Sequence, residues 1–202
     1  MAREHDDETL AFYDREAAVY AARARRPAER NARLEAFLAR LAPGASILEL
    51  GTGGGQDAEA MIAAGFEVAP TDGSAGLAVE AQRRLGRPVR VMRFEALDER
   101  ERYDAVWANA SLLHVPEEGL ADVLARVCRA LKRGGLFFAS FKGGDGGGRD
   151  RLGRYYNFVS RPRLEAAYGE AGAWIELSVC EEPGGGYDGV ERTWLMVTAV
   201  KG

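Results

Sequence analysis

Four closely spaced glycines follow a short apolar segment, and an acidic residue comes further along the chain. The glycines are Gly51, Gly53, Gly54 and Gly55, and the acid is Asp72. Such a dense cluster costs backbone entropy, so an inert linker explains it poorly; glycines let a ligand approach the main chain beside a helix N-terminus. A carboxylate about 20 residues later can accept hydrogen bonds from both ribose hydroxyls of an adenosine. Together these residues predict a site for an adenosine-containing cofactor.

The segments on either side of the glycines predict the elements that hold them. Residues 47–50 are mostly apolar, as in a strand buried within a parallel sheet, and residues 56–64 have the composition of a helix. A second strand over residues 66–71 ends on Asp72. A dinucleotide-binding fingerprint needs a third glycine where this chain has Gln56. The spacing therefore weakens NAD binding as an explanation without removing it.

Length and composition limit the class of protein. The chain has 202 residues, 47% of them hydrophobic, and a net charge of -4 at pH 7. We expect one domain, with N-terminal helices over residues 1–44 and a core over residues 45–202. Neither disorder nor a surface for polyanions is indicated, so nucleic acid is not an expected partner. No apolar run approaches the ~20 residues that cross a bilayer, and the acidic start does not resemble a secretion signal, which predicts a cytoplasmic protein.

The two cysteines do not suggest a structural or metal-binding role. Cys128 and Cys180 lie far apart in the sequence, without a CxxC pair. This arrangement argues against a disulfide framework and against a zinc site. We expect both thiols to be buried as small apolar residues, and we expect no metal site.

Aromatic and basic residues mark the N-terminal helices. Residues 6–26 predict a helix with Tyr13 and Tyr20 on one face and Arg25 near its end. One interpretation is an amphipathic helix packed on the domain with a solvated basic end. The alternative is a lid over a ligand, because arginine can clamp a carboxylate and aromatic faces attract a cation. Pro27 is expected to open a second helix.

A further group of polar residues follows a strand predicted over residues 103–108. Asn109 comes directly after this strand and is a candidate polar contact, since open α/β sheets bind ligands at the carboxyl ends of their strands. His114 comes a few residues later, and its ordinary pKa near neutrality suits a general base. A lone histidine between Leu113 and Val115 is more often a hydrogen-bonded structural residue, and we favour that interpretation.

The C-terminal part predicts a glycine-rich flap and an antiparallel edge of the sheet. Residues 142–150 form either an inert linker or a mobile active-site flap. Arg154 and Tyr155 come next, and their side chains could order over a substrate when such a flap closes. Strands over residues 173–180 and 191–200 are joined like a hairpin, which implies an antiparallel edge on a parallel sheet.

Four of these motifs resemble those of class I methyltransferases that use S-adenosylmethionine (SAM). They are the glycine loop at residues 49–55, the strand end at 71–74, the strand and loop at 103–116, and the helix, Gly-Gly turn and strand over 117–141. The resemblance covers residues 12–200 and extends to a bacterial subgroup labelled methyltransferase-domain or tellurite-resistance-like proteins. It implies a Rossmann-like α/β three-layer sandwich with a mostly parallel seven-stranded sheet, an antiparallel edge strand and an N-terminal helical lid.

The resemblance implies an enzyme that transfers the methyl group of SAM to a small-molecule nucleophile and releases S-adenosylhomocysteine (SAH). Because the sulfonium already activates the methyl group, the protein chiefly desolvates and aligns the nucleophile, and a general base is optional. Two alternatives are an NAD-dependent oxidoreductase and a SAM-binding module without catalytic activity. We expect no nucleic-acid or membrane partner, and either a monomer or a homodimer.

The resemblance also implies roles for individual residues. After a third strand expected over residues 88–93, the loop with Phe94 and Glu95 borders the adenine in the family, although Arg93 stands where an acidic residue is usual. Ser74 lies in the second motif but also suits the N-cap of the next helix, which we regard as its main role.

Three sets of candidates follow from the resemblance. The catalytic candidates are His114 and Tyr155, and the substrate candidates are Arg154, Tyr155 and Arg192. The cofactor-binding candidates are Tyr13, Tyr20, Arg25, Glu49, Gly51, Thr52, Gly53, Asp57, Asp72, Gly73, Ser74, Phe94, Glu95, Asn109 and Ala110.

Overall fold

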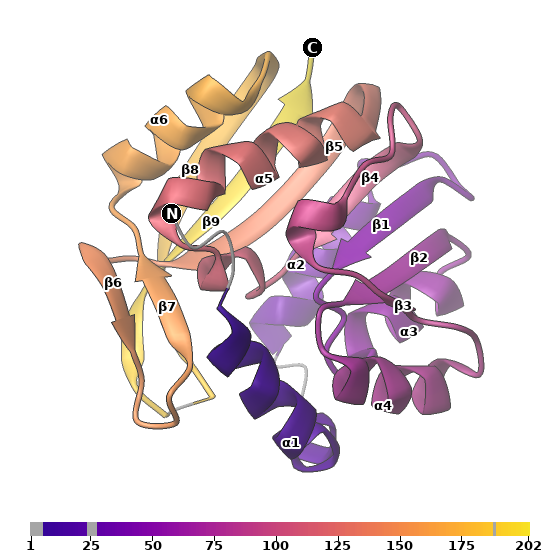
Figure 1. The fold of residues 1–202 in the computed structure, drawn as a ribbon. Coiled ribbons are helices and arrows are strands. Elements are labelled where there is room, and N and C mark those ends of the chain that lie inside the picture. The colour runs from indigo at the N-terminus through magenta and orange to yellow at the C-terminus, as the bar shows by residue number, and fades with distance from the viewer. Residues whose placement is uncertain (1–5, 24–27, 188) are drawn as a thin grey trace.

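The computed structural model describes residues 6–23, 28–187 and 189–202. Its main element is a seven-stranded sheet in the order β3-β2-β1-β4-β5-β9-β8, beside a separate two-stranded sheet of β6 and β7 (Figure 1). The strands are β1 (Ser46–Leu50), β2 (Glu67–Asp72), β3 (Arg90–Val91), β4 (Tyr103–Ala108), β5 (Leu131–Lys142), β6 (Gly146–Arg149), β7 (Tyr155–Phe158), β8 (Trp174–Gly185) and β9 (Glu191–Lys201).

Helices cover both faces of the large sheet. They are α1 (Asp7–Arg23), α2 (Ala28–Leu38), α3 (Gln56–Ala63), α4 (Ala75–Leu85), α5 (Glu117–Ala130) and α6 (Arg161–Ala171), with short 3-10 helices η1 (Phe94–Ala96) and η2 (Leu112–His114). Crossovers between parallel strands are right-handed, and the strand order reverses between β1 and β4. Hence α3 and α4 lie on one face and α5 on the other, where Figure 1 shows α5 and α6 in front of the sheet.

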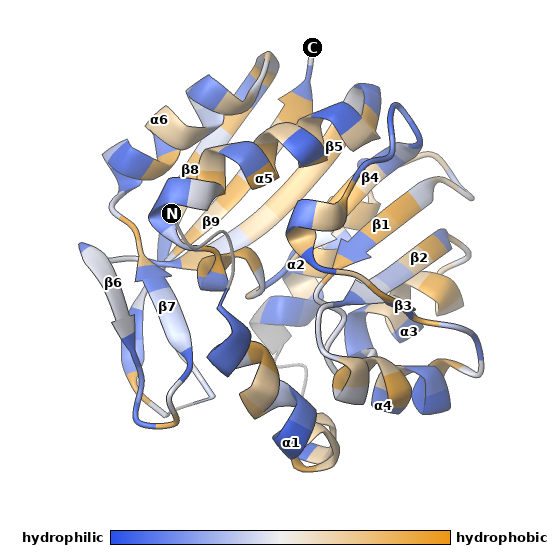
Figure 2. Ribbon diagram, in the orientation of Figure 1, coloured by the Kyte–Doolittle hydropathy of each residue, from blue (hydrophilic) through white to orange (hydrophobic). Residues whose placement is uncertain are grey.

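The central strands form the hydrophobic core. Ile47, Leu48 and Leu50 of β1 have no solvent exposure, and residues 105–108 of β4 are equally buried. Figure 2 shows these strands coloured as hydrophobic while the outer faces of α5 and α6 are largely hydrophilic. A strand buried on both faces is typical of a parallel sheet between two helix layers, which explains the apolar run at 47–50.

The C-terminal strands form the antiparallel part of the sheet. β9 runs antiparallel to β5 and to β8, while the pairs among β1 to β5 are parallel. The prediction of a mostly parallel seven-stranded sheet with an antiparallel edge is therefore confirmed. β8 extends to Gly185, so Pro183 belongs to the strand and pairs with Thr193 instead of lying in the connection.

Two sequence predictions about the backbone are wrong. The third strand is only Arg90–Val91, because it pairs solely with the last two residues of β2 at the sheet edge, where Val91 is 55% exposed. The glycine-rich segment at 142–150 is not an inert linker, because Gly146–Arg149 pairs in register with Tyr155–Phe158, while its role as a mobile active-site flap stays a prediction. Glycine is poor in intrinsic strand preference, so the sequence pattern did not reveal this hairpin, which we call the β6–β7 hairpin.

Other predictions have mixed outcomes. Cys128 is buried as expected, but Cys180 is exposed because its side chain projects from β8 at the edge of the sheet. α1 begins at Asp7 and is described as far as Arg23, so the predictions for Arg25 and Pro27 fall outside the described residues. Within the described part of the chain, no helix has the length and apolar character needed to cross a membrane.

Candidate functional site

A cavity lies at the carboxyl ends of β1, β2 and β4, with α1 over it. Its position between β1 and β4 is the point where the strand order reverses, which is where open α/β sheets bind ligands. The lining residues are Asp6, Thr9, Leu10, Tyr13 and Tyr20; Gly51, Gly53, Asp72, Gly73 and Leu77; and Arg93, Phe94, Glu95, Ala110, Ser111, His114 and Val115. They come from segments far apart in the sequence that the sheet brings to one edge.

The glycine loop forms one wall of the cavity, with backbone angles that favour glycine. Gly51 and Gly53 have φ values of 76° and 57°, in the left-handed region. A Cβ on Gly51 would overlap the side chain of Ser111, and one on Gly53 would lie 3.6 Å from a ring carbon of Tyr20. Both residues line the cavity, so the missing side chains leave the backbone accessible to a ligand.

Asp72 is buried at the end of β2 with its carboxylate in this wall. One oxygen accepts the Gly53 N–H at 2.8 Å, and the other accepts the Ser74 N–H at 2.8 Å. Burial raises the pKa of Asp72 to about 6, against the opposing effect of these two hydrogen bonds. A carboxylate has about four acceptor positions, so the two backbone bonds leave capacity for a pair of hydroxyl donors.

α1 covers the cavity and is tied to the body by several contacts. Tyr13 and Tyr20 line the cavity with their rings edge to face at 5.2 Å. The carboxylate of Asp14 accepts the Ser74 hydroxyl at 2.6 Å and the Gly76 N–H at 2.9 Å, at the N-terminus of α4. The predicted lid helix is thus placed over the cavity by contacts to the positive end of another helix.

His114 lies in the cavity wall between two hydrogen-bond partners. Its Nδ1 is 2.6 Å from the Tyr155 carbonyl oxygen, and its Nε2 is 3.0 Å from the Tyr13 hydroxyl. A carbonyl only accepts, so Nδ1 carries the hydrogen, and in a neutral ring Nε2 then accepts from Tyr13. Burial, with smaller effects of Arg154 and Lys142, lowers the pKa of His114 to about 4. The histidine is therefore neutral at physiological pH.

Several predicted cofactor residues do not line the cavity. Glu49 is buried in β1, where the Thr52 hydroxyl donates to it, and burial raises its pKa to about 8. Asp57 accepts two bonds from Arg30 and one from the Trp107 indole. The carboxylates of Glu49 and Asp57 and the hydroxyl of Thr52 therefore bond to other groups of the protein and belong to the scaffold of the glycine loop.

Ser74 and Asn109 also have roles within the protein. The Ser74 hydroxyl accepts the Leu77 N–H at 3.1 Å, which is the expected N-cap geometry for α4. Asn109 accepts a hydrogen bond from the Ser140 hydroxyl at 2.9 Å. Neither residue is among those lining the cavity, whereas Gly73, Phe94, Glu95 and Ala110 are.

None of the predicted substrate residues is among those lining the cavity. The Arg154 side chain is 1% exposed and pairs with Asp150 at 2.6 Å. Tyr155 reaches the site through its backbone carbonyl, while its phenol packs over Gly147 in the β6–β7 hairpin. The Arg192 guanidinium lies 5.1 Å from the ring centre of Phe158.

Sequence reasoning missed lining residues on both sides of the cavity. Ser111 is buried in the wall, and among the described residues its hydroxyl has no hydrogen-bond partner. Arg93, which lines the cavity where an acidic residue was expected, donates to Asp7 of α1 at 2.7 Å. The only sequence signal for Ser111 is its position just after the end of β4. The others missed are Asp6, Thr9, Leu10, Leu77 and Val115.

The fold and the cavity define the architecture of class I methyltransferases. Residues 47–135, which include the glycine loop, Asp72 and His114, match a family model described as a methyltransferase domain. By this match residues 47–135 are similar to a methyltransferase domain, and the whole chain has the fold of SAM-dependent methyltransferases. The narrower likeness to tellurite-resistance-like proteins stays a prediction. No curated protein sequence is significantly similar to the chain.

Solved structures share the fold at low sequence identity. A Burkholderia thailandensis 1,6-didemethyltoxoflavin-N1-methyltransferase, bound to 1,6-didemethyltoxoflavin and SAH, is 23% identical with a TM-score of 0.73, over 100% of this chain and 91% of that one. DhpI in complex with SAH is 24% identical with a TM-score of 0.69, over 100% and 99% of the two chains. The [4+2]-cyclase SpnF is 17% identical with a TM-score of 0.71, over 100% and 97%.

Proposed function

We propose that the chain is a SAM-dependent methyltransferase that acts on a small molecule whose nucleophilic nitrogen or oxygen carries a proton, and that the whole chain works as one domain. The observation that carries this proposal is the hydrogen bond between Tyr13 and His114 in the cavity wall. A cavity with a neutral histidine and two tyrosines suits a compact acceptor better than a polymer, since the net charge of -4 offers no attraction for nucleic acid.

The described residues fit SAM. Gly51 and Gly53 provide a backbone surface without side chains, and Asp72 retains acceptor positions for the ribose hydroxyls. Tyr13 and Tyr20 offer aromatic rings to a cation. SAM, when bound, supplies a methyl carbon that its sulfonium has made electrophilic. The residues of the chain align the nucleophile and keep water away from it.

Tyr13 and His114 together can remove a proton from the nucleophile. The nucleophile donates its hydrogen to the Tyr13 oxygen while the Tyr13 hydroxyl hydrogen moves to Nε2 of His114. The Tyr155 carbonyl accepts the Nδ1–H and holds the ring in the tautomer that this transfer needs. This proton transfer is the role we assign to the catalytic candidate His114, and Tyr155 contributes only its backbone.

The remaining attributes rest on sequence. We also propose a bacterial, cytoplasmic enzyme that is either a monomer or a homodimer and that binds neither nucleic acid nor a membrane. The acidic balance argues against nucleic acid, and the lack of a ~20-residue apolar run argues against a membrane.

The experiment is titration calorimetry of the purified protein with SAH and, in parallel, with NAD. We expect micromolar affinity for SAH and none for NAD, and then methyl transfer from labelled SAM to members of a panel of amines, phenols and heterocyclic N–H compounds. Because the cyclase SpnF shares the fold, turnover is the decisive step. SAH binding without transfer to any N–H or O–H acceptor, but with transfer to thiols or thioethers, contradicts the proposed acceptor class.

A further inference from the structure

We propose that Arg154 is a positioning residue for the Tyr13–His114 pair, whose guanidinium sets the direction of the Tyr13 hydroxyl hydrogen from the turn of the β6–β7 hairpin. The proposal rests on the proposed function, because it gives a task to the same proton pathway. It replaces the sequence prediction that Arg154 contacts substrate.

Arg154 is held in one place by charge and hydrogen bonds. Its Nε and Nη2 donate to the same oxygen of Asp150 at 3.0 and 2.6 Å, and both side chains are at least 98% buried. Asp150 also accepts the N–H groups of Leu152 and Arg154, which folds the hairpin turn around the pair. The remaining nitrogen of the Arg154 guanidinium, Nη1, donates to the Tyr13 hydroxyl oxygen at 3.1 Å.

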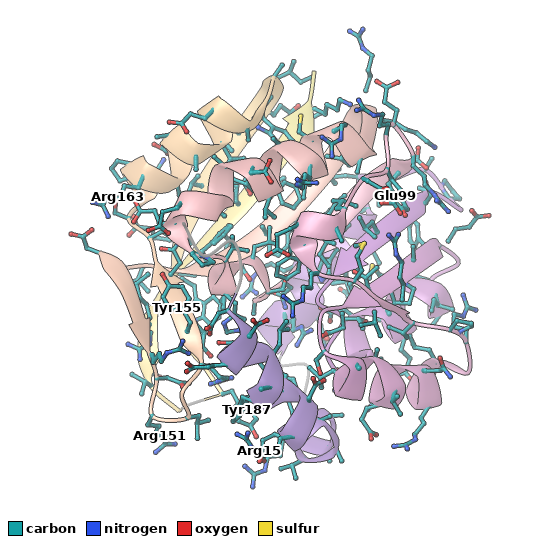
Figure 3. All side chains as sticks on the ribbon, in the orientation of Figure 1. Arg15, Glu99, Arg151, Tyr155, Arg163 and Tyr187 are labelled. Carbon is teal, nitrogen blue, oxygen red and sulfur yellow. The ribbon has the colours of Figure 1, made fainter. Side chains whose placement is uncertain are left out.

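Aromatic rings enclose the guanidinium on its remaining sides. The Cζ atom lies 5.1 to 5.7 Å from the ring centres of Phe12, Tyr13, Tyr156 and Tyr187. These rings come from α1, from β7 and from the connection between β8 and β9, where Figure 3 shows Tyr187 beside α1. Burying a charge costs free energy unless hydrogen bonds and an opposite charge compensate for the lost water. The Arg154 guanidinium is therefore held at a defined position by its partners.

The hydrogen-bond rules then determine the direction of each proton. A guanidinium has only donors, so the Tyr13 hydroxyl cannot donate to Arg154 and must accept from it. The hydroxyl hydrogen is therefore directed to Nε2 of His114. Without Arg154, the hydroxyl could turn away, and a protonated His114 could donate to its oxygen.

The groups around His114 act on its charge in opposite directions. Tyr13 from α1, Tyr156 and the Tyr155 carbonyl from β7, Lys142 from β5, and the Asp150–Arg154 pair from the hairpin all influence the ring. The two cations disfavour the imidazolium, while Asp150 on the far side of Arg154 favours it. Arg154 thus helps to keep Nε2 unprotonated and ready to accept.

The test is a proton and nitrogen NMR titration of His114 in the free protein. The chain has two histidines, and a His5→Gln variant assigns the remaining signal to His114. The test variant in that background is Asp150→Asn with Arg154→Gln, because replacing both members of a buried pair avoids an isolated charge. We expect the His114 midpoint to rise, because Arg154 acts on the ring more strongly than Asp150 does, while the Tyr155 carbonyl keeps the neutral ring in its Nδ1–H tautomer. We also expect the Nε2 nitrogen signal at neutral pH to shift, because the Tyr13 hydroxyl hydrogen is no longer directed to this atom.

A matched control removes another cation of the same hairpin. Arg149 pairs with Asp6, which precedes α1, and with Glu8 of α1, and no hydrogen bond joins it to Tyr13, so Arg149→Gln should leave the midpoint and the Nε2 signal unchanged. An unchanged His114 titration in the double variant overturns the proposal, as does an equal shift in Arg149→Gln, because either result means that Arg154 only stabilises the hairpin.

If the double variant does not fold, Arg154→Lys retains the charge without the planar fork. In that variant we expect the Nε2 nitrogen signal of His114 to shift at neutral pH, because the Tyr13 hydroxyl hydrogen is no longer directed to it, and a wild-type Nε2 signal overturns the proposal.

SAH calorimetry on the same samples separates the two hypotheses. Failure of the wild-type protein to bind SAH contradicts the proposed function, whatever the titration shows. Normal SAH binding with an unchanged His114 titration in the double variant leaves the methyltransferase intact and removes only the role of Arg154.

Discussion

The floor and the roof of the cavity are built from contacts of different range. The floor is the glycine loop with the ends of β2 and β4, and there Asp72 binds backbone groups 19 and 2 positions away. The roof is α1 with the β6–β7 hairpin and Tyr187, and there Tyr13 binds groups 101 and 141 positions away. The floor is thus fixed by strands that pair with their neighbours, while the roof depends on side chains meeting across the fold.

The carboxylates of the two regions also differ in their surroundings. In the floor, burial raises the pKa of Asp72 to about 6 and of Glu49 to about 8. In the roof, arginines pair with the acids instead, as Arg149 does with Asp6 and Arg154 with Asp150. The floor therefore responds to pH near neutrality, whereas in the roof Arg149 and Thr9 lower the pKa of Asp6 against the effect of burial.

The largest expected effect is on the floor, from Gly51→Ala. The positive φ and the overlap with Ser111 should together lower the free energy of unfolding by about 3 kcal/mol and abolish SAH binding. Urea denaturation measures the first effect and calorimetry the second. Gly44→Ala is the control, because Gly44 has a similar φ but no atom within 4 Å of a Cβ there. Equal costs for the two variants contradict a tightly packed floor.

Asp72→Ala should weaken SAH binding by about 1–3 kcal/mol, through the loss of a charged acceptor. In the wild type, affinity should also fall as pH drops below about 6, because protonation of Asp72 removes its charge. The variant should lack this pH dependence. Calorimetry from pH 5 to pH 8 checks both, with Asp122→Ala on the exposed face of α5 as the control. Equal pH profiles for wild type and Asp72→Ala remove this residue from the site.

Gly76→Ala tests how closely the roof docks. A Cβ there would lie 2.8 Å from the Asp14 carbonyl oxygen and 3.0 Å from the Ala17 side chain, so α1 must shift. We expect a destabilisation of about 1–2 kcal/mol and several-fold faster release of SAH, measured by stopped-flow fluorescence. The helical control Gly169→Ala meets no atom within 4 Å and should stabilise the protein by about 0.5–1 kcal/mol. Stabilisation by both substitutions means that α1 does not pack on α4.

Glu49→Gln should have the smallest effect, visible only as a change with pH. Folded Glu49 keeps a proton up to about pH 8, whereas the unfolded chain releases it near pH 4.5. The folded state thus binds more protons in this range, and the free energy of unfolding falls as pH rises. Between pH 6 and pH 7 the free energy of unfolding should change by about 1 kcal/mol more negatively in the wild type than in the variant, by urea denaturation, because Asp72 and His114 contribute equally to both proteins. Identical slopes would show that Glu49 is ionised in the folded protein.

The floor was the part of the molecule that the sequence could predict. Residues 47–50, the glycines and Asp72 lie within one local strand-loop-helix-strand unit, so spacing alone indicated both fold and adenosine-type site. The placement of Asp57 was not predictable, because its partners Arg30 and Trp107 come from elements whose packing no local pattern specifies.

The roof could be predicted only in outline. The aromatic face of α1 suggested a lid, but the pairing of Gly146–Arg149 with β7 has no signal in a run of glycines. Arg154 was expected at the substrate because it follows the glycine-rich segment, and its burial depends on Asp150 and on rings from two distant segments, α1 and the connection between β8 and β9.

Ser74 connects the floor and the roof through a single residue. Its N–H donates to Asp72, its hydroxyl donates to Asp14, and the same hydroxyl oxygen caps α4. Docking of α1 and occupation of Asp72 are therefore linked equilibria that share one hydrogen-bonding group. Linkage is reciprocal. If a bound ribose stabilises the docked state of α1 by some free energy, docking of α1 therefore strengthens ribose binding by the same amount.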